Sequence, residues 1–186
     1  QSENKKFFLK KVKNIFDEGF FSNHTFVRDF EKKFKKFNKS KFCLATSSGT
    51  SALEIILRSL NIKNKNVLVG SNTFIATAHA ITNAGGKIIP VDIEKKHYMM
   101  CPNDLKKKIN NKTKAIIFVH SFGNPSGFLE IKKISKKYKI PIIEDAACAI
   151  GSKIKSDYVG EKSDLACFSF HQKKILNTGE GGMITS

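Results

Sequence analysis

Residues 115–145, AIIFVHSFGNPSGFLEIKKISKKYKIPIIED, carry the pattern that decides the fold. Two short runs, AIIFVH at 115–120 and IPIIED at 140–145, are apolar rather than alternating between apolar and polar residues. Such runs are typical of parallel strands that helices cover on both faces. Between them lies an amphipathic segment, which predicts a helix over residues 129–138. A strand, a helix and a second strand in this order indicate a β-α-β unit.

The same alternation of short apolar runs and longer amphipathic segments continues along the rest of the chain. It predicts strands over residues 42–45, 67–69, 87–91, 115–120, 141–144 and 166–170. It predicts helices over residues 5–16, 27–37, 51–60, 74–83, 103–109 and 129–138. Together these elements predict an α/β fold with three layers, α/β/α, around a mostly parallel sheet.

The ends of the chain suggest part of a longer protein. The first residue is Gln1 rather than methionine, and an apolar strand has only just begun at Met183 when the chain stops at Ser186. No proline-rich linker or repeat divides the 186 residues. We therefore expect residues 1–186 to form one incomplete domain, with a further domain after it.

The charge of +17 raises the possibility of a nucleic-acid-binding protein. However, Arg28 and Arg58 are the only arginines, and the lysines are scattered in pairs along amphipathic segments such as 130–139. Base recognition and bidentate phosphate contacts favour arginine. A lysine-rich, solvated surface is the favoured interpretation, and we expect no nucleic-acid partner.

The cysteines and the hydropathy pattern bear on the compartment. Cys43, Cys101, Cys148 and Cys167 show no metal-ligand spacing, which indicates reduced thiols and no metal site. No apolar run approaches the roughly 18 residues that span a bilayer, so we expect no membrane association. A cytoplasmic protein fits both observations.

Polar residues follow three of the predicted strands. They are the hydroxyl-rich turn TSSGTS at 46–51, the carboxylate of Asp145, and the group Ser169, His171, Lys173 and Lys174. In open parallel sheets, ligands bind outside the carboxyl ends of the strands. We therefore expect a hydroxyl and glycine turn, a carboxylate and a lysine to converge on one edge of the sheet.

Each of these signals has an ordinary structural alternative. The SSGTS turn opens a predicted helix, where free N–H groups attract phosphate, but serine and threonine are also common N-caps. Asp145 ends a buried strand, where a carboxylate is unfavourable unless it is paired, yet it could simply cap the next turn. No P-loop motif is present, and no helix is expected after Gly179–Gly182, which excludes a Rossmann fingerprint there.

Taken together, the phosphate site, the carboxylate and the lysine describe a pocket for pyridoxal 5′-phosphate. The pyridinium nitrogen of that cofactor needs an anionic partner, and its aldehyde needs an amine for a Schiff base.

The chain resembles the amino-terminal half of the DegT/DnrJ/EryC1/StrS family, which comprises fold-type-I, pyridoxal-phosphate-dependent aminotransferases of nucleotide-linked keto sugars. The resemblance rests on segments that occur in the family's order and spacing. They are GFFSN…FVRDFEKKF, ATSSGTSALEIILRSL, GSNTFIATAHAITNAGGKIIPVDI, TKAIIFVHSFGNPSGFLEI, IPIIEDAACAIGS and DLACFSFHQKKILNTGEGGMIT. This resemblance implies that residues 1–186 are the cofactor-binding large domain.

The resemblance also implies roles for individual residues. Lys174, rather than Lys173, matches the Schiff-base lysine, and Asp145 matches the partner of the pyridine nitrogen. The residues implied at the cofactor phosphate are Gly49, Thr50, Ser51 and Ser169. Phe74 would stack on the ring, although without the family it would be taken as a core aromatic.

The resemblance covers three further positions. Cys148 stands near the expected ring hydroxyl, where the family usually has a glutamine, histidine or similar polar residue, and a thiol is a weaker hydrogen-bond donor. His120 and His171 match family positions, but each could be a structural histidine.

The resemblance implies transfer of an amino group from an amino acid, glutamate in most relatives, to a nucleotide-linked keto sugar. Such reactions serve amino-sugar and surface-polysaccharide biosynthesis, and the family implies a homodimer with the active site at the interface. Two alternatives remain open at this point. They are a sugar dehydratase of the same family and, more distantly, a non-enzymatic basic DNA-binding or regulatory protein.

Overall fold

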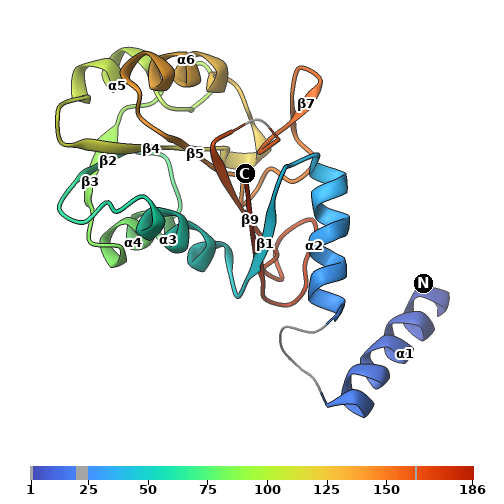
Figure 1. Ribbon diagram of the computed structural model, residues 1–186. Coiled ribbons are helices and arrows are strands. Elements are labelled where there is room, and N and C mark those ends of the chain that lie inside the picture. The colour runs from blue at the N-terminus through green and yellow to red at the C-terminus, as the bar shows by residue number, and fades with distance from the viewer. Residues whose placement is uncertain (1, 20–24, 162) are drawn as a thin grey trace.

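The computed structural model describes residues 2–19, 25–161 and 163–186 and shows the predicted three layers (Figure 1). A seven-stranded sheet runs through the middle in the order β1-β9-β8-β5-β4-β2-β3. Strand β9 is antiparallel to both of its neighbours, and the other pairings are parallel. The predicted mostly parallel sheet is therefore confirmed.

The bounds of the elements follow the predicted segments within one to three residues. The strands of the sheet are β1 (Cys43–Thr46), β2 (Asn66–Gly70), β3 (Lys87–Val91), β4 (Thr113–Val119), β5 (Ile142–Asp145), β8 (Leu165–Ser169) and β9 (Gly182–Thr185). The helices are α1 (Ser2–Glu18), α2 (Thr25–Asn38), α3 (Gly49–Ser59), α4 (Ile75–Asn83), α5 (Pro102–Lys108) and α6 (Phe128–Tyr138), with a short 3-10 turn, η1 (Ser121–Gly123).

The apolar runs of β4 and β5 are explained by cores on both faces of the sheet. Ile117 and Ile143 point into a cluster that α3 and α4 cover. Their neighbours Ile116 and Ile142 point into a second cluster, which α5 and α6 cover on the opposite face (Figure 1). Because successive side chains of a strand face opposite sides, a strand buried on both faces must be apolar at nearly every position.

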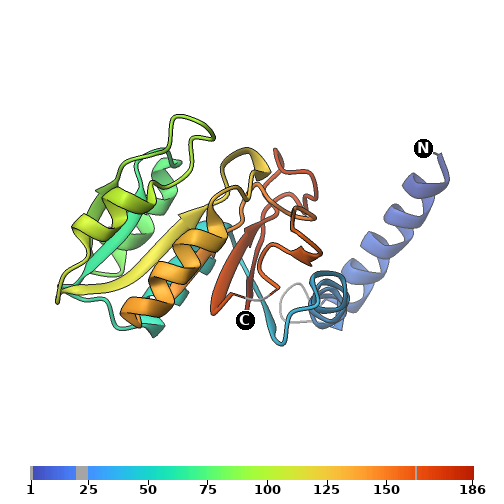
Figure 2. The ribbon, with the colours of Figure 1, turned by 90° about the horizontal axis from the view of Figure 1, so that it is seen from above.

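A third cluster of aromatic side chains closes the β1-β9-β8 end of the sheet. Phe34 of α2 packs edge to face on Phe168 and Phe170, with ring centroids 5.0 and 5.5 Å away. Helix α1 lies apart from the sheet in both views (Figures 1 and 2), and its Phe7, Phe8 and Phe16 side chains are largely exposed.

Two features were not among the predicted elements. A small hairpin of β6 (Lys153–Ile154) and β7 (Asp157–Tyr158) follows β5, and its two-residue strands are too short to give a periodic pattern. Strand β9 was foreseen only as an apolar start at Met183. Its insertion between β1 and β8, with opposite direction, depends on pairing between distant segments.

Candidate active site

Three parallel strands end at the same edge of the sheet, and their last residues are Thr46 of β1, Asp145 of β5 and Ser169 of β8. Because β9 runs the other way, it begins at this edge, where Gly182 pairs with both Thr46 and Ser169. The structure therefore brings the hydroxyl turn, the carboxylate and the segment after β8 to one edge, as the sequence predicted.

Two glycines, one in the turn that opens α3 and one at the start of β9 beside that turn, are packed too tightly for any larger residue. A Cβ added to Gly49 would lie 2.8 Å from the Cβ of Ser169. A Cβ added to Gly182 would lie 2.4 Å from the carbonyl carbon of Ser48. Gly49 and Ser169, both predicted to contact a phosphate, are therefore direct neighbours.

The N-cap of α3 is Ser48, whose Oγ accepts a hydrogen bond from the N–H of Ser51 at 3.0 Å. The Ser51 hydroxyl also lies 3.0 Å from the Ser48 hydroxyl. The N–H groups of Gly49 and Thr50 occupy the first helical turn, where the helix itself supplies no acceptor. Capping and anion binding are thus compatible at this turn, because they use different N–H groups.

Asp145 is 7% exposed, and its carboxylate is held by two hydrogen bonds. The Thr77 hydroxyl donates to Oδ2 at 2.9 Å, and the Ala147 N–H donates to Oδ1 at 3.2 Å. The Thr73 hydroxyl in turn donates to the Thr77 hydroxyl at 2.8 Å. Within the described ranges, no cationic side chain forms an ion pair with Asp145. A buried carboxylate in this state favours the arrival of a positively charged group.

Sequence reasoning missed Thr77, the residue that orients the Asp145 carboxylate. Thr77 is buried on α4, although threonine is polar. A threonine on the inward face of a predicted helix that flanks the strand-end carboxylate is the signal that could have found it.

The thiol of Cys167 also lies beside Asp145. Complete burial and the negative charge of Asp145 raise the pKa of Cys167 well above its ordinary value. Cys167 is therefore a neutral thiol, and it does not compensate the Asp145 charge.

Lys174 lies in the turn after β8, and its Nζ donates to the Sγ of Cys148 at 3.1 Å. The backbone N–H of Lys174 donates to the carbonyl of His171 at 2.8 Å, which fixes the turn. Lys174 is partly buried, whereas Lys173 is exposed. The structure thus brings together Lys174 and Cys148, which lies three residues after Asp145.

Phe74 precedes the first residue of α4 and is 77% exposed. Its interpretation as a core aromatic is therefore wrong. It lies one residue after Thr73, the start of the hydrogen-bonded chain that leads through Thr77 to Asp145. Its predicted role in stacking stays a prediction.

The two histidines have different environments. His120 is buried, and its Nε2 lies 2.7 Å from Oε2 of Glu144, an ion-pair geometry on the α6 side of the sheet. This supports the structural alternative for His120. His171 is partly exposed, and its Nε2 lies 3.5 Å from Oε1 of Glu180.

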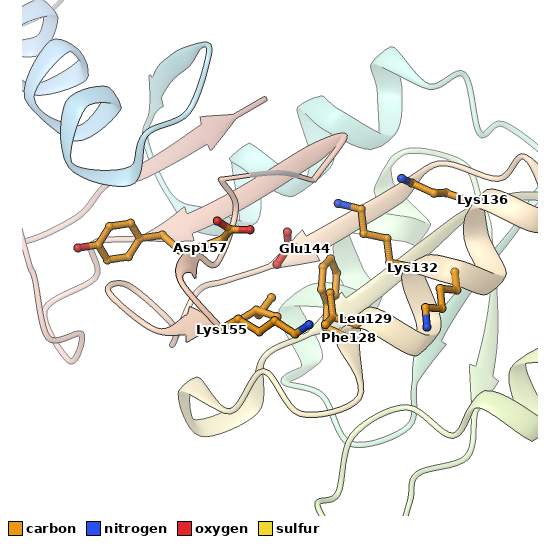
Figure 3. A pocket seen from close by; sticks show the side chains of 10 residues that line it. Phe128, Leu129, Lys132, Lys136, Glu144, Lys155 and Asp157 are labelled. Carbon is orange, nitrogen blue, oxygen red and sulfur yellow. The ribbon is translucent and has the colours of Figure 1, made fainter.

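A cavity of about 450 Å³ lies between α6 and the β6-β7 hairpin (Figure 3). Its labelled side chains are Phe128, Leu129, Lys132, Lys136, Glu144, Lys155 and Asp157. None of the predicted site residues lines this cavity. The strand-end edge therefore remains the candidate site on chemical grounds.

Comparison with known proteins places the chain in a family. The model of the DegT/DnrJ/EryC1/StrS aminotransferase family matches residues 2–186. The chain belongs to this family. Among curated proteins, GDP-perosamine synthase of Escherichia coli O157:H7 is 39% identical over 166 residues, which is 89% of this chain and 46% of that protein. GDP-perosamine synthase of Vibrio cholerae is 32% identical over 179 residues, which is 95% of this chain and 49% of that protein.

Solved structures agree with this membership. DesV of S. venezuelae, solved in complex with a ketimine intermediate, has a TM-score of 0.95 at 28% identity. The match covers all of this chain and 50% of DesV. The protein ntda of Bacillus subtilis, solved with bound cofactor PMP, has a TM-score of 0.93 at 29% identity. The match covers all of this chain and 42% of ntda. The predicted fold class is therefore confirmed, and the chain spans about half the length of the relatives that it matches.

Proposed function

We propose that this chain is the cofactor-binding large domain of a pyridoxal-phosphate-dependent aminotransferase, completed by a smaller carboxy-terminal domain. The observation that carries the proposal is the presence at one strand-end edge of Asp145, a buried carboxylate with no cation among the described residues, and of Lys174, whose Nζ contacts Cys148. The relatives named GDP-perosamine synthase and the structure solved with PMP support it.

The residues present fit the cofactor. Gly49 packs directly on Ser169, which leaves the first N–H groups of α3 to meet a phosphate beside the Ser169 hydroxyl. Asp145 would accept a hydrogen bond from the protonated ring nitrogen, and the exposed ring of Phe74 would lie on the cofactor face. When bound, the cofactor supplies an aldehyde for the Lys174 amine and withdraws electrons from the substrate carbon.

The chain's own residues then have separate tasks. Thr77 and the Ala147 N–H hold the Asp145 carboxylate in place, so that its charge keeps a proton on the nitrogen opposite. The Lys174 amine moves a proton to and from the reacting carbon of the substrate as general base and acid. Cys148, in contact with that amine, limits where its nitrogen can move.

We further propose that the donor is an amino acid, glutamate first among them, and that the acceptor is a nucleotide-linked keto sugar. The product would be an amino sugar for surface polysaccharides. The relatives' names support sugar amination. We propose a homodimer for the intact protein, and a cytoplasmic location in keeping with four free cysteines. No helix of the described ranges is long and apolar enough to cross a membrane.

The test uses the intact protein, supplied with pyridoxal phosphate, glutamate and a panel of nucleotide-linked keto sugars. We expect the cofactor absorbance to change on adding glutamate alone and the sugar to gain an amine, detected by mass spectrometry. A product that has lost water without gaining nitrogen would indicate the dehydratase alternative instead. A protein that neither binds the cofactor nor shows its absorbance would contradict the proposal.

A further inference from the structure

The contact between Cys148 and Lys174 joins two loops that are 26 residues apart in the sequence. The thiol follows β5 in the turn after Asp145, and the amine follows β8. The Nζ and Sγ atoms are 3.1 Å apart, and Cys148 is exposed to solvent. A nucleophilic nitrogen and an accessible sulfur are thus already in contact.

The other three thiols have different surroundings. Cys167 is fully buried, and burial together with the Asp145 charge raises its pKa well above the ordinary value. Burial also raises the pKa of Cys43, whose sulfur lies 3.1 Å from the Ser40 hydroxyl. Cys101 is partly buried at the start of α5. Reactive cysteines are exposed and lie near basic groups, and Cys148 alone among the four is both exposed and hydrogen-bonded to a lysine Nζ.

We propose that Cys148 and Lys174 form a reversible sulfur–nitrogen bond when a hydroperoxide oxidises the thiol. In the first step the thiol sulfur takes one oxygen from the hydroperoxide, whose O–O bond breaks, and becomes a sulfenic acid while the hydroperoxide is reduced to water or an alcohol. In the second step the neutral amine of Lys174 attacks that sulfur. The S–O bond breaks, and the hydroxide leaves as water with a proton from the nitrogen.

The net change is the loss of two hydrogen atoms from the protein and a two-electron reduction of the peroxide. A dithiol reverses the bond by attacking the sulfur, which returns the amine of Lys174 and, after a second exchange, the thiol of Cys148. The hydroperoxide and the dithiol are the only other reactants.

The consequence for activity rests on the proposed function, because it requires Lys174 to be the residue that attaches the cofactor. An amine held by sulfur cannot attach to an aldehyde, so the oxidised protein would not take up pyridoxal phosphate. Conversely, bound cofactor would occupy the amine and protect it. Oxidation would therefore act as a switch on the cofactor-free protein.

The experiment treats the intact, cofactor-free protein with hydrogen peroxide and maps its tryptic peptides without reduction. We expect the peptide 140–153, which contains Cys148, to be joined to the peptide that begins at Lys174. The mass of the joined product should be lower than the sum of the two peptide masses by two hydrogen atoms. Trypsin separates that peptide from the one containing Cys167, so a disulfide between Cys148 and Cys167 would give a different product. Dithiothreitol should release the joined peptides.

Matched variants locate the bond. Lys173→Arg should form it as the unmodified protein does. Lys174→Arg should not, but its Cys148 should still react with dimedone after oxidation, because the first step does not need the amine. Recovery of peptide 140–153 with only a disulfide, a sulfinic acid or an unmodified thiol would overturn the proposal.

Loading the protein with pyridoxal phosphate before peroxide separates this inference from the proposed function. We expect the joined peptides to fall at least about tenfold, since the amine is occupied. If the joined peptides formed equally well with the cofactor bound, the proposed sulfur–nitrogen bond would stand. The proposed attachment of the cofactor to Lys174 would then be wrong.

Discussion

Glu144 and Asp145 are adjacent buried carboxylates at the end of β5, and they face opposite sides of the sheet. Glu144 is 1% exposed and meets His120 at 2.7 Å, while the Gly160 N–H donates to its other oxygen at 3.3 Å. Asp145 is 7% exposed, and its partners among the described residues are neutral: the Thr77 hydroxyl, the Ala147 N–H and the Cys167 thiol. Glu144 is paired with a histidine, whereas Asp145 is held in place without a cation from the part of the chain that the structure describes.

The difference teaches that burial alone does not identify a functional carboxylate. A buried charge must be compensated. Where the chain supplies the compensation, as His120 does for Glu144, the group contributes to stability. Where the described residues supply orientation but no cation, as at Asp145, the group is prepared for a ligand.

The largest effect is expected from Lys174→Ala, which removes the amine on the Asp145 side of the sheet. Amino transfer should be abolished, and borohydride treatment of the cofactor-loaded protein should leave no covalent pyridoxyl group. The fold should persist, because Lys174 is only partly buried. Lys173→Ala is the matched control and should retain the label. If the pyridoxyl label were absent from Lys173→Ala and present on Lys174→Ala, Lys173 would be the residue that attaches the cofactor.

The second effect is that of Asp145→Asn, which keeps the shape of the side chain and removes its charge. Loss of one partner of a buried charge pair is worth about 2–5 kcal/mol, so turnover should fall by roughly 30- to 5,000-fold. The unfolding free energy of the cofactor-free protein should change little, because no cation in residues 2–19, 25–161 or 163–186 loses a partner. Steady-state kinetics and chemical denaturation measure the two quantities. Near-normal turnover of Asp145→Asn would contradict the assignment of Asp145 as the carboxylate that serves the ligand.

The third effect is that of Glu144→Gln, the same neutralisation one residue earlier. We expect the unfolding free energy to fall by about 1–3 kcal/mol, because the charge-assisted bond to His120 is lost in the core. Tm should fall by about 2–4 °C for each kcal/mol. Cofactor binding should be kept. If Glu144→Gln removed cofactor binding while stability stayed unchanged, the assignment of the two carboxylates would have to be exchanged.

The smallest effect is expected from Phe74→Ala. An aromatic stacking contact is worth about 0.5–1.5 kcal/mol, so cofactor affinity should weaken by roughly two- to tenfold, as measured by absorbance titration. Stability should not change, because the ring is 77% exposed. Phe168→Ala is the contrasting control, since that ring is buried against Phe34 and its loss should destabilise by about 3–5 kcal/mol. Destabilisation by Phe74→Ala would exclude an open ligand-facing ring.

The alternation of strands and helices, the three layers and the family could all be predicted from the amino-acid sequence. Hydrophobic period is a local property, and the continuous apolar runs at 115–120 and 140–145 already require cover on both faces of the sheet. The strand ends were equally readable, because parallel strands place their carboxyl ends on one edge. Family membership followed from motifs that stand in order along the chain.

Only the tertiary structure decided how the site residues are paired. Thr77 reaches Asp145 across 68 residues, His120 reaches Glu144 across 24, and Lys174 reaches Cys148 across 26. Which of two adjacent acids faces the site depends on strand register, and a slip of one residue would exchange their faces. Register and long-range partners are set by packing of the whole sheet against its helices, and no local pattern in the sequence contains them.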